Sequence, residues 1–177
     1  HGDGQQQLLP KKVEAFADQR VVAVSAGDLR SLALTADGAV WSCGYGGFGQ
    51  LGHGDGQNQW LPKKIEALAG QRVLAVLAAA RHSLAITADG AVWSWGDGDY
   101  GRLGHGDEEK QLLPKKVEAF ADQRVVAVSA GRSHSLSITA SGAVFTWGKG
   151  EDGCFRHGED LPIHVLPPKV AAWALGP

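Results

Sequence analysis

The chain has 177 residues with 17 Lys and Arg against 19 Asp and Glu, and its formal net charge of −2 provides no overall attraction to nucleic acid or anionic lipid. It contains no apolar run long enough to span a bilayer and opens on no recognisable signal peptide, so we expect neither a membrane partner nor secretion. Its two cysteines, Cys43 and Cys154, occupy different positions of an internal repeat. We therefore expect no disulfide and an intracellular location, which the sequence does not resolve into cytoplasm, nucleus or cilium.

In chain order, a linker rich in glycine and aspartate comes first, HGDGQQ at 1–6, and we expect turns there. The next segment, LPKKVEAF at 9–16, carries a proline and two lysines. Proline cannot donate to a central ladder, and lysine on a sheet edge discourages pairing with other chains, so 11–16 is predicted to be an outer strand. This segment recurs as LPKKIEAL at 61–68 and as LPKKVEAF at 113–120.

Three short strand candidates follow each outer segment. The three-strand stretch occurs at 21–44, 73–96 and 125–148. In the third copy, 125–130 is apolar and rich in β-branched residues, and 135–139 and 143–147 place apolar residues two apart. Gly131 and Gly142 mark the corners between them, where a tight turn needs glycine. The pattern predicts a small antiparallel meander.

The copies are spaced by 52 residues, and a period of this length with several strands in each unit is typical of a propeller blade. Each meander is predicted to take the outer strand that follows it in the sequence. The predicted blades are blade one at 20–68, blade two at 72–120 and blade three at 124–173, with outer strands at 63–68, 115–120 and 169–173. The segment 11–16 is then an orphan outer strand. We predict an all-β fold, a single partial β-propeller domain over 1–177 with four-stranded antiparallel blades.

The repeat carries a recognisable set of residues. The third copy has Gly131, His134, Ser135, Trp147 and Gly148. The second copy shows the pattern best, with His82-Ser83-Leu84, Asp89-Gly90, Val92-Trp93-Ser94-Trp95-Gly96, Gly101 and Leu103-Gly104-His105-Gly106. On these residues the chain resembles the regulator-of-chromosome-condensation repeat family over essentially its whole length. Because members of that family are typically seven-bladed propellers, the resemblance implies about three blades of a seven-bladed ring, within a longer polypeptide or a large assembly.

The resemblance implies several different functions, among which a fold does not choose. Family members serve as exchange factors for a small nuclear GTPase, chromatin binders, UV-B photoreceptors, modules of ubiquitin ligases, ciliary proteins and protein inhibitors. The photoreceptor branch has a tryptophan after the glycine corner, where this chain has Asp28, Ala80 and Arg132. The exchange-factor branch inserts a long hairpin, for which a 52-residue spacing leaves no room.

Several repeated residues are expected to be structural. These are His82, His134, Trp93, Trp95, Trp147, Gly44, Gly96 and Gly148. His82 and His134 precede the second strand of their blades with no consistent nucleophile or acid beside them, so we expect hydrogen bonds across a blade junction rather than catalysis. The tryptophans are expected to fill the space between blades. One histidine per linker cannot gather four metal ligands, and the acidic clusters lack the spacing of a calcium loop, so we predict no metal, no cofactor and no catalytic residue.

The loops that differ between copies are the expected binding surface. Rigid blades present such loops, and exposed aromatic and arginine side chains dominate interface energetics. The protein-binding candidates are Tyr45, Phe48, Tyr100, Arg102, Phe155 and Arg156. We predict a non-enzymatic protein-binding or scaffold module that takes no small-molecule substrate. The alternative is guanine-nucleotide exchange on a Ran-like small GTPase with chromatin association.

Overall fold

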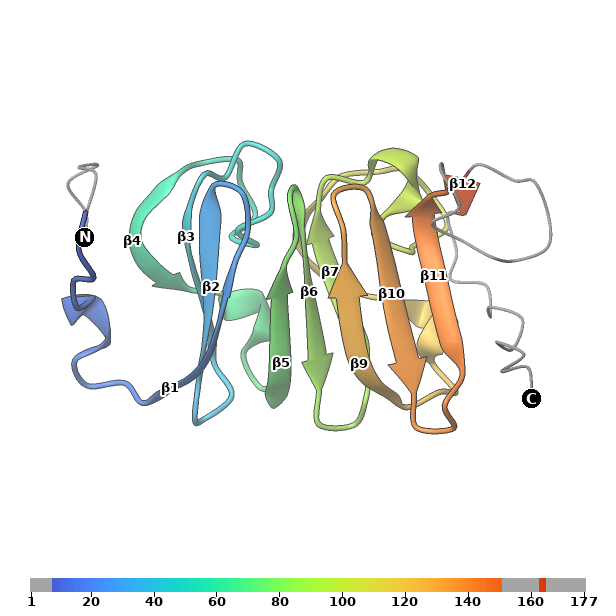
Figure 1. Cartoon of the computed structure of the whole chain (residues 1–177), viewed down its shortest axis with the longest axis horizontal. Helices are drawn as coiled ribbons and strands as arrows, with labels where there is room; N and C mark the ends of the chain where they lie inside the picture. The colour runs from blue at the N-terminus through green and yellow to red at the C-terminus, as the bar shows by residue number, and fades with distance from the viewer. Residues whose placement is uncertain (1–7, 151–162, 165–177) are drawn as a thin grey trace.

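The structure, a computed structural model, describes residues 8–150 and 163–164, and within them three four-stranded sheets stand side by side (Figure 1). Blade one consists of β1 (Val21–Ala26), β2 (Arg30–Thr35), β3 (Val40–Gly44) and β4 (Gln59–Lys64). Blade two consists of β5 (Val73–Ala78), β6 (His82–Thr87), β7 (Val92–Gly96) and β8 (Gln111–Lys116). Blade three consists of β9 (Val125–Ala130), β10 (His134–Thr139), β11 (Val144–Lys149) and β12 (Ile163–His164). The predicted fold class, an all-β propeller of four-stranded antiparallel blades with about three blades present, is confirmed.

Each blade begins with the predicted meander, and a local polar network closes its second hairpin. In blade one, the hydroxyl Oγ1 of Thr35 lies 2.5 Å from Oδ1 of Asp37, and the following Gly38 has φ of 87°. A left-handed residue at this corner is costly for any side chain with a Cβ, which explains the Asp-Gly pair. Blade two repeats the arrangement with Thr87, Asp89 and Gly90.

The outer strands differ from the prediction. They were expected at 63–68 and 115–120, but β4 ends at Lys64 and the next residues form a 3₁₀ turn, η2 (Glu66–Leu68). The turn η4 (Glu118–Phe120) does the same after β8. Ile65 and Leu68 are both buried, and a spacing of three residues reaches one face in a 3₁₀ turn but opposite faces in a strand. The second half of the repeated LPKKIEAL segment therefore forms a turn at the end of the outer strand and does not lengthen that strand.

The predicted orphan strand at 11–16 is not a strand. Its last three residues form the 3₁₀ turn η1 (Glu14–Phe16), and the Phe16 ring packs edge-on against Trp41, with ring centroids 5.8 Å apart. An identical EAF sequence forms η4, so the same turn forms whether or not a described strand precedes it. The outer strand predicted for blade three at 169–173 lies outside the described residues; β12 pairs with β11 instead.

The apolar core lies between the blades. One buried cluster joins blades one and two and includes Leu34, Leu68 and Trp95. A second cluster joins blades two and three and includes Ile86, Phe120 and Trp147. Each blade is thus stabilised mainly by its neighbours, as expected of a repeat architecture.

Candidate functional site: the loop face of blades two and three

Polar contacts join adjacent blades at the residues that open the second strands of blades one and two. His82 is fully buried, and its Nε2 lies 2.8 Å from Oγ of Ser135 in blade three. Burial lowers the pKa of His82 well below its usual value, and the nearby positive charges of Arg102 and Arg30 lower it further. A neutral imidazole with this partner acts as a structural hydrogen bond across the junction.

Arg30 occupies the same place in blade one. Its guanidinium donates to the carbonyl oxygens of Ala79 and Ala80 in blade two, at 3.0 and 3.1 Å, and to Oγ of Ser83 at 3.0 Å. Burial lowers its pKa to about 10, against the opposing effect of Asp28. Arg30 and His82 therefore both form hydrogen bonds from the start of a second strand to the next blade, at different junctions.

Tryptophans of the third strands close these junctions. The indole Nε1 of Trp95 donates to the carbonyl oxygen of Gln50 at 2.9 Å, and that of Trp147 donates to the carbonyl oxygen of Arg102 at 2.9 Å. Both indoles are fully buried, whereas Trp93 is half-buried beside the core between blades one and two. An indole has a large apolar surface and one N–H donor, so it suits a buried junction between two blades when that donor has a partner.

Glycines end the third strands because the backbone there turns toward the preceding corner. Gly44, Gly96 and Gly148 have φ of 114°, 112° and 105°. A Cβ at Gly96 would lie 2.5 Å from the carbonyl oxygen of Arg81. Any other residue would therefore be strained by its backbone and would clash with the corner loop.

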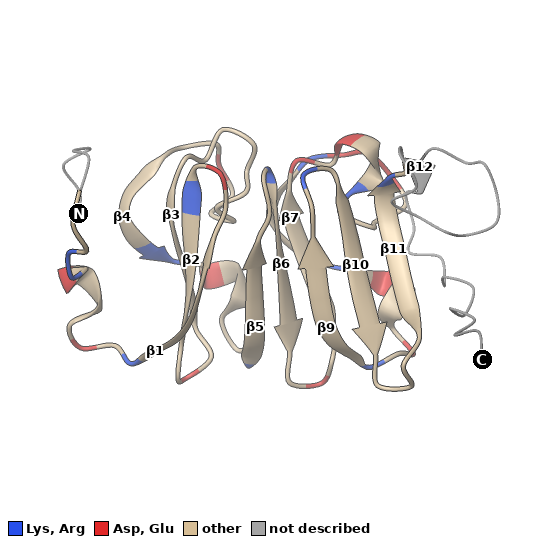
Figure 2. Ribbon diagram, viewed as in Figure 1, with Lys and Arg blue, Asp and Glu red and all other residues tan. Residues whose placement is uncertain are grey.

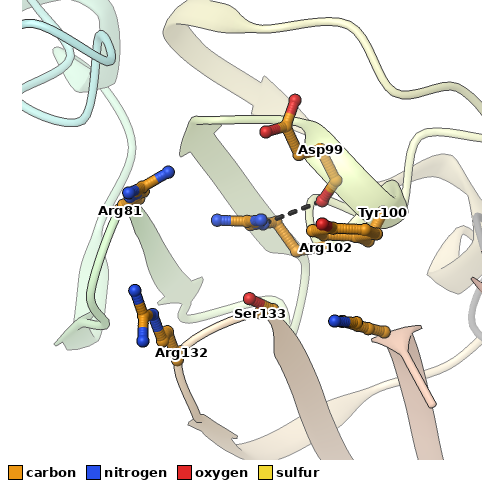
Figure 3. Close-up of a pocket in the computed structure, with 7 residues that line it drawn as sticks. Arg81, Asp99, Tyr100, Arg102, Arg132 and Ser133 are labelled. Carbon is orange, nitrogen blue, oxygen red and sulfur yellow. Dashed lines mark hydrogen bonds between the residues drawn. The ribbon is translucent and has the colours of Figure 1, made fainter. Parts of the chain in front are cut away.

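The variable loops meet at one end of the blades and enclose a pocket of about 280 Å³ between blades two and three (Figure 3). It is lined by Arg81, Asp99, Tyr100, Arg102, Arg132, Ser133 and Lys149. These residues come from the corner before β6, the corner before β10, the loop after β7 with its turn η3 (Asp99–Gly101), and the end of β11. Figure 2 shows that basic (blue) and acidic (red) residues both lie on the loops at this end of blades two and three.

Arg102 is one of the predicted protein-binding residues, and the expectation that its side chain is exposed is wrong, because it is only 2% exposed. Its Nη1 lies 3.0 Å from Oδ2 of Asp97, and its Nε donates to the carbonyl oxygen of Asp99 at 2.8 Å. Burial lowers the pKa of Arg102, while Asp97 and Asp99 oppose that shift. Arg102 therefore forms the inner wall of the pocket rather than projecting from it.

Tyr100 has an unusual backbone. Its φ is 61°, the only positive value among the non-glycine residues that the structure describes. Tyr100 is 37% exposed, and its ring lies between two cations, with its centroid 5.6 Å from Cζ of Arg102 and 5.0 Å from Nζ of Lys149. Strained backbone conformations concentrate at binding sites, where the surrounding structure maintains them.

Tyr45 and Phe48 occupy the corresponding loop of blade one. Their rings contact edge to face with centroids 5.7 Å apart, and Cζ of Arg81 lies 4.6 Å from the centroid of Phe48. Arg81 thus connects this aromatic pair to the pocket. The remaining predicted contact residues, Phe155 and Arg156, lie outside the described residues.

The sequence analysis did not single out Arg81, Arg132 and Lys149. The available signal was variation between copies: the position of Arg81 is Leu29 in blade one and Ser133 in blade three. Such variation marks a loop but does not say which loops converge. In the described part of the chain, no group of three His, Cys, Asp or Glu residues could hold a metal ion, and no helix is long and apolar enough to cross a membrane.

Comparison with known families identifies the repeat. The regulator of chromosome condensation (RCC1) repeat matches residues 37–86 and 89–138, and a second description of the same repeat matches 21–50 and 125–154. The chain belongs to the RCC1 repeat family. It is 41% identical over 163 residues to the human E3 ubiquitin-protein ligase HERC2, and 33% identical over 171 residues to the ultraviolet-B receptor UVR8 of Arabidopsis thaliana.

These RCC1 relatives are longer than the chain. The match covers 91% of the chain but 3% of HERC2, and 94% of the chain but 39% of UVR8. Among solved structures, human WBSCR16 is similar with a TM-score of 0.76 and 30% identity, covering 87% of the chain and 38% of that protein. Prp20p of Saccharomyces cerevisiae, studied for its binding to Gsp1p and histones, has a TM-score of 0.78 and 25% identity, covering 88% and 39%.

Blade one of this RCC1 array carries a second hollow, an apolar groove of about 300 Å³. Its lining includes Phe16, Val24, Trp41, Cys43 and Trp60. The same face of blades two and three is covered by the preceding blade. Val24 is 76% exposed, whereas the matching residues Val76 and Val128 are partly buried against the two core clusters. In blade one, Val13 and Phe16 from the preceding segment line part of the groove, and Val24 stays exposed.

Proposed function

We propose that the chain is a non-enzymatic protein-binding module whose binding surface is the loop face of blades two and three. The observation that carries this proposal is the pocket around Arg102, where a buried ion pair with Asp97 holds an arginine in place beneath exposed side chains. Such a support lowers the entropy lost on binding, because the contact groups are ordered before the partner arrives.

The serine and histidine pairs of the repeat favour a structural role over catalysis. His53 Nε2 lies 2.9 Å from Oγ of Ser42, and His105 Nε2 lies 2.9 Å from Oγ of Ser94. Each serine hydroxyl also donates to a backbone carbonyl oxygen, that of Leu51 at 2.8 Å in blade one. Since one hydroxyl has one hydrogen, the histidine must donate to the serine oxygen and cannot act as the base that activates it.

Affinity capture with the 177-residue chain as bait tests the protein-binding function. The variant Tyr100→Gly removes an exposed ring from the pocket while allowing the positive φ, and Val126→Ala shortens an exposed side chain of β9 that lies outside the pocket. We expect the chain to retain specific partners, Tyr100→Gly to lose them and Val126→Ala to keep them. Equal retention by both variants would contradict the assignment of the binding surface.

The alternative function, nucleotide exchange on a Ran-like GTPase, is supported by the similarity to Prp20p and its binding to Gsp1p. The uniform 52-residue spacing of the blades weighs against it, since it leaves no room for an inserted contact hairpin. A nucleotide-release assay separates the two functions. Acceleration of nucleotide release by the chain would replace the scaffold proposal with the exchange function.

A further inference from the structure

The two junctions between blades are built from the same positions of the repeat. At each junction, three aliphatic side chains from the second and third strands of one blade pack against the next blade. These aliphatic triads are Leu32, Leu34 and Val40 in blade one, and Leu84, Ile86 and Val92 in blade two. All of these residues are at most 4% exposed. Each junction therefore joins an aliphatic triad on one blade to a receiving face on the following blade.

Blade three carries the same aliphatic triad with less cover. Its members are Leu136, Ile138 and Val144, which stand 52 residues after those of blade two. Ile138 is 43% exposed, whereas the matching Ile86 is 4% exposed. Leu136 and Val144 are only partly buried. Apolar surface that a junction buries in the first two blades is thus partly open to solvent on blade three.

Blade one carries the matching receiving face, which is the apolar groove described above. Val24 and Trp41 line this groove. Their counterparts Val76 and Trp93 pack against the core cluster at the first junction. The preceding segment fills part of the groove, since the Phe16 ring packs against Trp41. Among the described residues, however, none supplies the counterpart of an aliphatic triad to this face, and Val24 remains 76% exposed.

A serine of the second strand provides the polar contact of each junction. Oγ of Ser83 accepts a hydrogen bond from Arg30 at 3.0 Å, and Ser83 is fully buried. Oγ of Ser135 lies 2.8 Å from Nε2 of His82, and Ser135 is fully buried as well. The matching residue of blade one, Ser31, lines the apolar groove and is exposed. Blade one therefore leaves uncovered both the apolar and the polar positions at which the other two blades receive their neighbour.

We propose that the groove of blade one binds the aliphatic triad of blade three from a second copy of the chain, so that copies associate head to tail. One chain carries both halves of a contact that it already forms twice between its own blades, which favours a second copy over an unrelated partner. Among the described residues that line the groove none is charged, which suits an aliphatic ligand. Because the two halves differ, each association leaves a groove at one end and a triad at the other, and further copies can add unless a ring closes. None of these residues lines the loop-face pocket, so the contact is independent of the binding function proposed above.

Sedimentation velocity of the 177-residue chain tests the proposal with two complementary variants. Val24→Lys places a charge in the groove and leaves the triad intact, whereas Ile138→Lys places a charge in the triad and leaves the groove intact. Since a charge is costly to bury, each variant alone should self-associate at least about tenfold more weakly than the wild-type chain. An equimolar mixture of the two should nevertheless form a dimer, in which the intact triad of the first variant binds the intact groove of the second.

The control variant is Val126→Lys, because this position is exposed in every blade, as Val22, Leu74 and Val126. It should change self-association by less than about twofold. Melting curves show whether each variant keeps the fold, and Ile138→Ser, which removes apolar surface without adding a charge, takes the place of Ile138→Lys if that variant does not. A wild-type chain that stays monomeric at high micromolar concentration, or variants that do not associate on mixing, would overturn the proposal. Loss of association in Val24→Lys but not in Ile138→Lys would also overturn it, in favour of a contact between two grooves.

Discussion

His82 and Ser135 belong to different blades, yet the imidazole Nε2 of one lies 2.8 Å from the hydroxyl of the other in a fully buried junction. The same hydroxyl donates to the carbonyl oxygen of Arg102 at 3.0 Å. One serine thus joins the second strand of blade two, the loop that carries the pocket, and blade three. Through it the loop that lines the pocket is joined to the junction between blades two and three.

The first prediction concerns this serine. Ser135→Ala should lower the free energy of unfolding by about 1 to 3 kcal/mol, because it leaves a buried imidazole nitrogen and a buried carbonyl oxygen with one partner fewer. Chemical denaturation followed by tryptophan fluorescence measures this difference. The matched control is Ser137→Ala on the same strand, since Ser137 is equally buried and its hydroxyl has no hydrogen-bond partner among the described residues. Equal destabilisation by the two substitutions would show that the inter-blade bond contributes nothing.

The second prediction concerns Trp147, which is fully buried and donates to the Arg102 carbonyl oxygen. Trp147→Ala should lower the free energy of unfolding by about 3 to 5 kcal/mol. Trp60→Ala should change it by about 0.5 kcal/mol or less, since Trp60 is 66% exposed. Acrylamide quenching of single-tryptophan variants gives an independent check. An indole at Trp147 that is quenched as readily as that of Trp60 would contradict the burial.

The repeat period and the alternation of apolar residues were sufficient to predict the meanders and the order of strands in each blade. The outer strands were misplaced because the residues after Lys64 suit both a strand and a 3₁₀ turn, and the choice depends on a neighbouring blade that buries Ile65 and Leu68 together. Local sequence does not contain that information. Tertiary packing decided the ending of the strand.

The pocket was harder to predict than the fold. The variable loops were identified, but the position of Arg102 is buried, as is that of the matching Gln50 in blade one, and in blade two the Asp97 carboxylate pairs with the buried charge. The other copies have Tyr45 and Lys149 at the position of Asp97. A pairing that occurs in one copy leaves no trace in a repeat pattern. Arg132 enters the pocket from a different blade, and only the packing of the blades brings it near Arg102.

The third prediction is a loss of stability in acid. Burial is the largest cause that lowers the pKa of His82 and of His105, the latter to about 4. Because these values lie below the pKa near 6.5 of an unfolded histidine, the unfolded chain binds more protons, so stability is fully present above about pH 6.5 and falls as the pH decreases toward 4. Melting temperatures measured across this range check it. His105→Gln should flatten the dependence, and an unchanged slope would contradict the assignment.

The fourth prediction separates strain from function at Tyr100. Because its φ is 61°, Tyr100→Gly should leave stability unchanged or raise it by up to about 1 kcal/mol, while Tyr100→Ala keeps the strain and should be less stable than the glycine variant. Both variants remove the ring and should weaken partner capture alike. Thermal melts and affinity capture measure the two effects. A marked loss of stability in the glycine variant would show that the ring, and not the binding role, maintains this conformation.

The last prediction is that the isolated 177-residue chain associates through blade one. Its apolar groove contains Val24 and Trp60, which are 76% and 66% exposed. In blades two and three the same face is covered by the preceding blade. Burial of apolar surface is worth about 25 cal/mol per Å², so a second apolar surface should bind there at micromolar concentration. Sedimentation velocity measures the association. Val24→Lys places a charge in the groove and should shift the chain toward monomer, whereas Val126→Lys changes an exposed valine of blade three, 53% exposed and outside the groove, and should not. A monodisperse monomer that melts cooperatively would show that three blades remain stable with this face uncovered.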